Sequence, residues 1–206
     1  MTRESWRGTR DPRTRLELIT KPLRHVCQKF ILEGYPPDRN VRKKVTKNTR
    51  AIGVTVVMNG ESVDILVVED DDSQRASIVL ALQDSIPDVV VVAVRDGGEA
   101  LDFLFGRGAW TERLGDNPPR LILLDLALPG SDGFSVLGQI RSIEPQDALM
   151  VTPVVIFTDS KAAGDISQSY RCGANSYIIK PLSYPDFQAI VTIVGQYWMT
   201  HNQPAA

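Results

Sequence analysis

Polar residues follow directly after several short apolar runs, and this arrangement restricts the fold more than any other feature of the sequence. The apolar runs are residues 65–68, 121–124, 154–157 and 177–179. The polar residues that follow them are Glu69 and Asp70, Asp125, Thr158, and Lys180. A buried carboxylate at the end of an apolar strand costs free energy unless a cation pairs with it. Parallel strands would gather these polar ends at one edge of a sheet.

From residue 64 onward, β-branched runs alternate with segments of helical period, which predicts an α/β fold with a doubly wound, mostly parallel sheet of five strands. The expected strands are residues 65–69, 89–94, 121–125, 154–158 and 176–179. The expected helices are residues 73–85, 97–105, 132–142 and 164–172, and one that begins at Ser183. Ser73 is the expected N-cap of the first helix, and residues 106–119 are expected to form a loop.

The last helix places its apolar residues on one stripe, which indicates a core-facing surface. The stripe consists of Phe187, Ile190, Val191, Val194 and Trp198. We expect Trp198 to pack in the core rather than to contact a partner.

The N-terminal part of the chain has a different composition. Residues 1–50 hold 14 Lys and Arg against 5 Asp and Glu, whereas residues 51–206 hold 9 against 20. We expect a folded domain over residues 63–203 and a basic, disordered extension over residues 1–62. Two alternatives stay open: translation starts at Met58, or the basic segment is an arm that contacts nucleic acid.

Composition also excludes several classes. The two cysteines, Cys27 and Cys172, predict neither a disulfide framework nor a thiolate metal site, which favours a reducing cytoplasm. No apolar run approaches the roughly 20 residues of a membrane span, and the charged N-terminus lacks a signal core. We therefore expect a cytoplasmic protein that does not contact membranes.

The predicted sheet edge suggests a chemistry. Ligands of doubly wound sheets bind beyond the carboxyl ends of the strands. Three carboxylates gathered there would repel one another unless they bound a divalent ion, and hard oxygen ligands suit Mg²⁺. Because Mg²⁺ favours phosphate as a further ligand, phosphoryl transfer is the leading chemistry. Asp125 would be the nucleophile, Lys180 would neutralise phosphoryl oxygens, and Thr158 would donate its hydroxyl.

Four motifs in this order resemble the receiver domain of two-component response regulators over residues 64–200. They are Val67-Val68-Glu69-Asp70, residues 123–133 around Asp125, Phe157-Thr158, and Lys180-Pro181. The resemblance implies a flavodoxin-like sheet of order 2-1-3-4-5 with helices on both faces. It also implies a signalling protein rather than an enzyme, phosphorylated by a sensor histidine kinase, and it leaves homodimerisation open.

The resemblance further assigns roles to individual residues. Asp125 would accept the phosphoryl group, and Mg²⁺ would be held by Glu69, Asp70, Asp125 and the backbone carbonyl of Ala127. Lys180 and Thr158 would contact the phosphoryl group, Tyr177 would turn inward as a switch, and the peptide before Pro181 would be cis. Ala127 and Asp159 depart from the family pattern, so the rate of dephosphorylation is left open.

A narrower resemblance is to stand-alone regulators that partner bacterial phytochromes, which implies a phytochrome-type kinase. It rests on residues 96–104, the long loop before the third strand, residues 173–177 and residues 196–200.

An enzyme of the haloacid-dehalogenase type would carry Asp-x-Asp-x-Thr or Val after the first strand, but here Asp70-Asp71-Asp72-Ser73 is followed by Gln74, so this class is rejected. A DNA-binding regulator remains the alternative function, through the basic extension. Nucleic-acid binding is not expected, because the chain ends soon after the last helix and the extension lacks a helix-turn-helix pattern.

Overall fold

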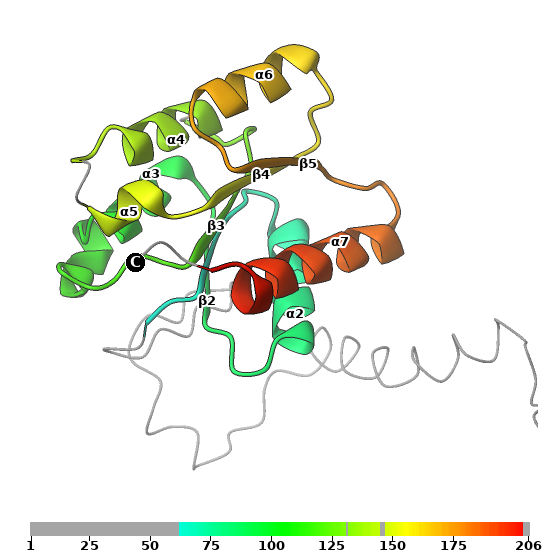
Figure 1. Cartoon of the computed structure of the whole chain (residues 1–206), viewed down its shortest axis with the longest axis horizontal. Helices are drawn as coiled ribbons and strands as arrows, with labels where there is room; N and C mark the ends of the chain where they lie inside the picture. Colours follow the sequence, from blue (N-terminus) through cyan, green and yellow to red (C-terminus); the bar gives the residue numbers. More distant parts are fainter. Residues whose placement is uncertain (1–61, 131, 145–146, 204–206) are drawn as a thin grey trace, which may run out of the picture. The chain divides into compact units, whose positions relative to one another are not determined.

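The computed structural model describes residues 62–130, 132–144 and 147–203, which form an α/β unit (Figure 1). The expectations for residues 1–61, including a start at Met58 and a basic arm, lie outside the described residues.

Five parallel strands form one sheet in the order β2-β1-β3-β4-β5. They are β1 (Ile65–Val68), β2 (Val91–Val94), β3 (Leu121–Leu124), β4 (Val154–Thr158) and β5 (Ser176–Ile179). The predicted fold class and strand order are confirmed. Strands β1 and β3 lie at the centre, and the strand order reverses between them.

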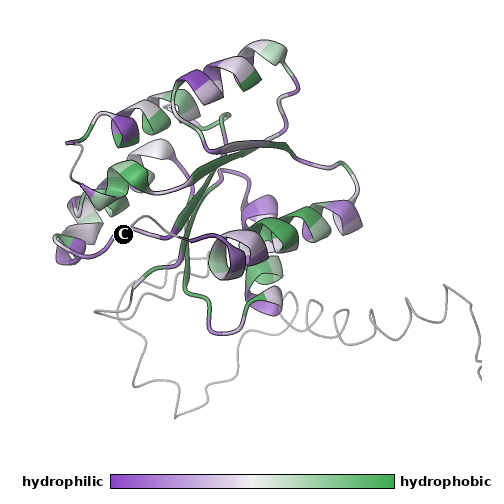
Figure 2. Ribbon diagram, in the orientation of Figure 1, coloured by the Kyte–Doolittle hydropathy of each residue, from purple (hydrophilic) through white to green (hydrophobic). Residues whose placement is uncertain are grey.

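The strands form because their residues are apolar on both sides, as expected for a parallel sheet covered by helices on both faces. Alternate residues of each strand pack into two separate cores. Leu66, Val68, Ile122 and Leu124 belong to one core, and Ile65, Val67, Leu121 and Leu123 belong to the other. Figure 2 shows mostly hydrophobic residues along the strands, whereas the helices carry both hydrophobic and hydrophilic residues.

Helices cover both faces of the sheet (Figure 1). One face carries α3 (Gly97–Leu104), α4 (Gly133–Arg141), α5 (Ala148–Val151) and α6 (Ala163–Arg171). The other face carries α2 (Asp72–Ser85) and α7 (Tyr184–Gln196), which pack against each other. Among the described residues the longest helix, α2, has 14 residues, and none of the helices there has the length and apolar character of a membrane span.

The first helix begins one residue earlier than predicted, and its N-cap is Asp71 rather than Ser73. The Asp71 carboxylate accepts hydrogen bonds from the backbone N–H groups of Ser73 at 2.9 Å and Gln74 at 2.8 Å. Asp71, Asp72 and Ser73 are all capping-type residues, so the sequence alone does not decide among them. The Ser73 hydroxyl also donates to Asp71, and this bond lowers the pKa of Asp71.

The segment of residues 106–119 is not a plain loop, because it contains the 3₁₀ helix η2 (Gly108–Arg113). Trp110 of this helix packs edge-on against Phe103 of α3, with ring centroids 5.0 Å apart. The short helix α5 was also not predicted, since four residues are too few to show a helical period.

The apolar stripe of α7 packs in the core, as predicted. Phe187, Val191 and Val194 are buried. Ile190 and Trp198 pack against the core that contains Ile65 and Leu121. A short π-helix, η3 (Tyr197–His201), follows α7.

Candidate functional site

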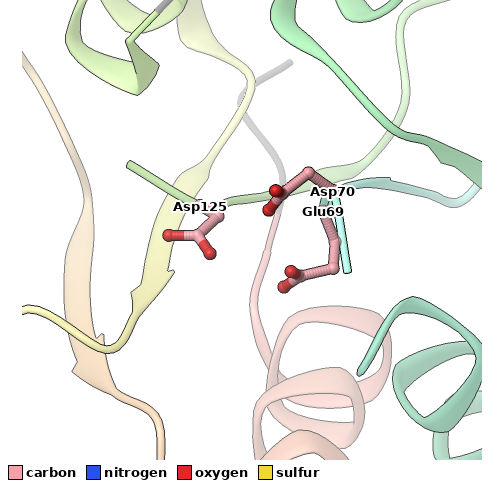
Figure 3. A group of neighbouring side chains, drawn as sticks. All are labelled: Glu69, Asp70 and Asp125. Atoms are coloured by element: carbon pink, nitrogen blue, oxygen red, sulfur yellow. The ribbon is translucent and has the colours of Figure 1, made fainter. Parts of the chain in front are cut away.

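The register of the two central strands brings three carboxylates together. Val68 pairs with Leu124, so Glu69 and Asp125 leave the sheet side by side, and Asp125 N donates to Val68 O at 3.0 Å. With Asp70, these residues each offer a carboxylate oxygen within 4.8 Å of the others. Figure 3 shows the three side chains at the ends of β1 and β3.

The three acids differ in their exposure to solvent. Glu69 and Asp125 have exposed fractions of only 2% and 4%, whereas Asp70 is exposed. Water and ions can therefore reach the cluster from the side of Asp70.

Lys180 lies between the two buried acids. Its Nζ is 2.7 Å from Glu69 Oε2 and 2.5 Å from Asp125 Oδ2. Burial disfavours the ammonium, but the two carboxylates outweigh burial and hold the pKa of Lys180 above its ordinary value. Burial raises the pKa of Glu69 although Lys180 acts in the opposite direction. The two shifts are consistent because Lys180 contacts two carboxylates, whereas Glu69 is desolvated by burial and shares its single ammonium with Asp125.

Thr158 and Tyr177 are linked to each other through Ser160. Thr158 is buried at the end of β4, and its Oγ1 accepts a long hydrogen bond of 3.5 Å from Ser160 N. Tyr177 is half-buried on β5, and its hydroxyl donates to Ser160 O at 3.0 Å. Burial raises the pKa of the Tyr177 hydroxyl. Ser160 was not identified from the sequence, because its backbone rather than its side chain makes both contacts.

Backbone groups orient the two buried acids. Ala127 N donates to Asp125 Oδ1 at 3.2 Å, and Asp71 N donates to Glu69 Oε1 at 3.2 Å. Gly133 lies so close behind Asp125 that an added Cβ would be 2.3 Å from the Asp125 carbonyl oxygen. A residue without a side chain is thus required behind the strand end that carries Asp125.

The peptide bond before Pro181 is trans, so the expected cis bond is wrong. Trans is the intrinsically favoured isomer even before proline. Lys180 reaches the acids with a trans bond, and its backbone N–H donates to Thr158 O at 2.8 Å.

An open cavity of about 300 Å³ adjoins Lys180 between α2 and the segment that joins β5 to α7. Its lining includes Gln74, Asp159, Leu182 and Tyr184. Asp159 is exposed, so it adds negative charge to the cavity that adjoins Lys180.

The donor set fits a divalent cation of the hard type. All the side-chain donors are carboxylate oxygens, and the exposed side of the cluster leaves room for water ligands. A bound cation would also reduce the repulsion among three acids, only two of which contact Lys180.

Comparison with known proteins gives concordant matches. The model of the response regulator receiver domain matches residues 65–192. The relative named "Probable methanogenesis regulatory protein FilR2" of Methanothrix harundinacea is 37% identical over 139 residues, which cover 68% of this chain and 85% of the relative. Response regulator Rcp1 of Synechocystis sp. is 34% identical over 145 residues, which cover 69% of this chain and 93% of the relative.

Solved structures agree with these matches. The phosphorylated cyanobacterial phytochrome response regulator RcpA superposes with a TM-score of 0.64 at 34% identity and covers 71% of this chain and 100% of its own. The Mn²⁺-bound form of Rcp1 superposes with a TM-score of 0.63 at 32% identity and covers 70% of this chain and 99% of its own.

Receiver domains bind a divalent metal ion, are phosphorylated by sensor histidine kinases and signal through the change that phosphorylation causes. The strand order, the acid cluster beyond the central strands, and the matches in sequence and structure all lead to the same assignment. The chain belongs to the response regulator receiver domain family.

Proposed function

We propose that Asp125 accepts a phosphoryl group from the phosphohistidine of a sensor histidine kinase, beside a Mg²⁺ ion held by Glu69, Asp70, Asp125 and the carbonyl oxygen of Ala127. The observation that carries this proposal is the buried contact of one ammonium with two carboxylates, next to a third carboxylate that faces solvent. Such a cluster sets three carboxylates against one ammonium, an excess of two negative charges, which favours a divalent cation.

The transfer is a displacement at phosphorus. An Oδ atom of Asp125 forms the new P–O bond, the P–N bond to the donor imidazole breaks, and its electron pair stays on the imidazole nitrogen. When bound, Mg²⁺ supplies charge neutralisation for the phosphoryl oxygens. Lys180 is already within 2.5 Å of Asp125 Oδ2, so it can move its donated hydrogen bond to a phosphoryl oxygen with little change in position.

The phosphoryl group then acts on the neighbouring strands. It adds negative charge and strong acceptor oxygens, which attract the Thr158 hydroxyl as a donor. Movement of Thr158 disturbs the hydrogen bond that it accepts from Ser160 N, and the carbonyl oxygen of Ser160 accepts from the Tyr177 hydroxyl. The proposed signal is the resulting inward turn of Tyr177 and the altered surface of α6, β5 and α7.

The kinase partner is proposed to be of the phytochrome type. Support comes from the similarity to the phosphorylated phytochrome response regulator RcpA. The expectation is tested by comparing phosphotransfer from a phytochrome-type histidine kinase with transfer from an unrelated kinase. Equal rates would contradict it.

The acceptor is tested by incubating the full chain with acetyl phosphate and Mg²⁺ and measuring its intact mass. We expect one added phosphoryl group in the wild type and none in Asp125→Asn. Asp159→Asn is the matched control, because Asp159 also follows a strand but is exposed and makes no contact with Lys180 among the described hydrogen bonds. Equal labelling of Asp125→Asn and wild type would overturn the assignment.

A further inference from the structure

An arginine occupies a core position of α2. Arg75 stands first in the inward-facing series Arg75, Ile78, Val79 and Leu82, whose other members belong to the apolar core. Its exposed fraction is 6%. A buried guanidinium costs free energy unless its donors are satisfied, so its partners indicate what it contributes.

The partners of Arg75 all belong to the segment that joins β1 to α2. Its Nη1 donates to Glu69 O at 2.8 Å and to Asp70 O at 3.2 Å, and its Nη2 pairs with the Asp72 carboxylate. The first two are the backbone carbonyls of the two acids whose side chains face Asp125. One side chain therefore contacts the main chain of two of the three clustered acids.

This contact opposes the effect of electrostatic repulsion within the acid cluster. Glu69 and Asp70 are adjacent in the chain and lie with Asp125 within 4.8 Å, so their repulsion favours any movement that separates them. Arg75 opposes such movement by holding both carbonyls with a planar, rigid donor group. An aliphatic residue at this position would fill the core but hold neither carbonyl.

We propose that Arg75 is a positioning residue for the cation site: it fixes the backbone of Glu69 and Asp70 so that their carboxylates face Asp125 before a divalent ion arrives. The inference rests on the proposed metal function of this cluster. Groups that orient metal ligands contribute about 10- to 100-fold to metal affinity. We expect Arg75→Met to weaken Mg²⁺ binding by about tenfold.

Arg141 provides a matched control elsewhere in the fold. Its guanidinium also donates to backbone carbonyls, those of Gly173 at 3.0 Å, Met150 at 2.8 Å and Thr152 at 3.0 Å. None of these belongs to the acid cluster. Arg141→Met should therefore lower stability, as Arg75→Met does, without changing Mg²⁺ affinity.

The experiment is calorimetric titration of the full-length variants with Mg²⁺, well below their unfolding temperatures, together with urea unfolding. Arg75→Lys, which retains the charge but not the planar fork, should bind with an affinity between those of wild type and Arg75→Met. Asp72→Asn should bind as wild type does, because both carbonyl contacts remain.

Wild-type affinity in Arg75→Met would overturn the inference, as would an equal loss in Arg141→Met. If Arg75→Met does not fold, wild-type affinity in Arg75→Lys overturns the inference, and so does a loss of affinity in Arg141→Met equal to that in Arg75→Lys. Failure of the wild type itself to bind Mg²⁺ would instead contradict the proposed function.

Discussion

Replacing Lys180 by methionine removes the ammonium that contacts the buried carboxylates of Glu69 and Asp125. The side chains of Lys180, Glu69 and Asp125 have exposed fractions of 2%, 2% and 5%, and the lysine contacts both acids at 2.7 Å or less. Methionine is similar in length and apolar, so the change removes the charge and leaves the packing nearly intact. Two carboxylates then remain buried without a cation.

The expected loss of stability follows from this geometry. Breaking a buried ion pair by removing one partner costs about 3–5 kcal/mol, because a charge is left buried and unpaired. Water can approach from the exposed side of Asp70, so we expect a value near the lower end, about 3 kcal/mol. This loss is a large fraction of the free energy of unfolding of a typical domain, which is roughly 5–15 kcal/mol.

The assay is urea unfolding in EDTA at pH 7 and at pH 5. Burial already raises the pKa of Glu69 above its ordinary value of 4.5, and loss of the ammonium raises it further. A group with a raised pKa in the folded state stabilises the protein at low pH and loses that contribution as pH rises. The deficit of Lys180→Met relative to wild type should therefore shrink at pH 5.

Two variants test the interpretation. Lys161→Met removes an exposed lysine and should change stability by less than about 0.5 kcal/mol. Adding Asp125→Asn to Lys180→Met should recover part of the loss, because the two residues interact directly. If Lys180→Met is as stable as wild type at pH 7, or if its deficit grows at pH 5, the ammonium does not offset the buried acids.

Asp70→Asn should remove the increase in melting temperature that Mg²⁺ causes. It should not lower stability in EDTA, because Asp70 is exposed and its carboxylate repels the other two acids. A full increase in melting temperature with Mg²⁺ in a thermal scan would contradict this. Gly133→Ala places a Cβ 2.3 Å from the Asp125 carbonyl oxygen, so the free energy of unfolding measured in urea should fall by about 1–3 kcal/mol. Gly138→Ala places its Cβ in open space and should not lower this free energy, so similar values for the two variants would refute the packing argument. Tyr177→Phe removes one hydrogen bond and should cost about 1 kcal/mol while phosphorylation by acetyl phosphate continues; loss of labelling would show that Tyr177 acts in the transfer itself.

The strand order and the meeting of the strand ends follow from sequence for a physical reason. Strands that are apolar on both sides require a parallel sheet with helices on both faces, and a parallel sheet places all carboxyl ends at one edge. The sequence positions of Glu69, Asp125 and Lys180 were therefore sufficient to predict that they meet. The chemical roles of these residues stay predictions until the site is tested.

Other features depend on tertiary contacts and could not be predicted. The partners of Arg75 are backbone carbonyls, which carry no sequence signal, although a charged residue in the series 75, 78, 79 and 82 does mark an unusual core position. The choice of Asp71 over Ser73 as N-cap depends on the residue at which β1 ends and the chain turns into α2. The isomer before Pro181 involves only about 0.5–1 kcal/mol, which the surroundings can decide either way.

The most direct test of the central assignment is to locate the phosphoryl group. The full chain is phosphorylated in the presence of Mg²⁺ and reduced with borohydride, which converts an aspartyl phosphate to homoserine, and its peptides are sequenced by mass spectrometry. We predict homoserine at position 125 and an unchanged Asp70. Homoserine at another position, or none in a sample whose intact mass shows phosphorylation, would contradict the role of Asp125 as the acceptor.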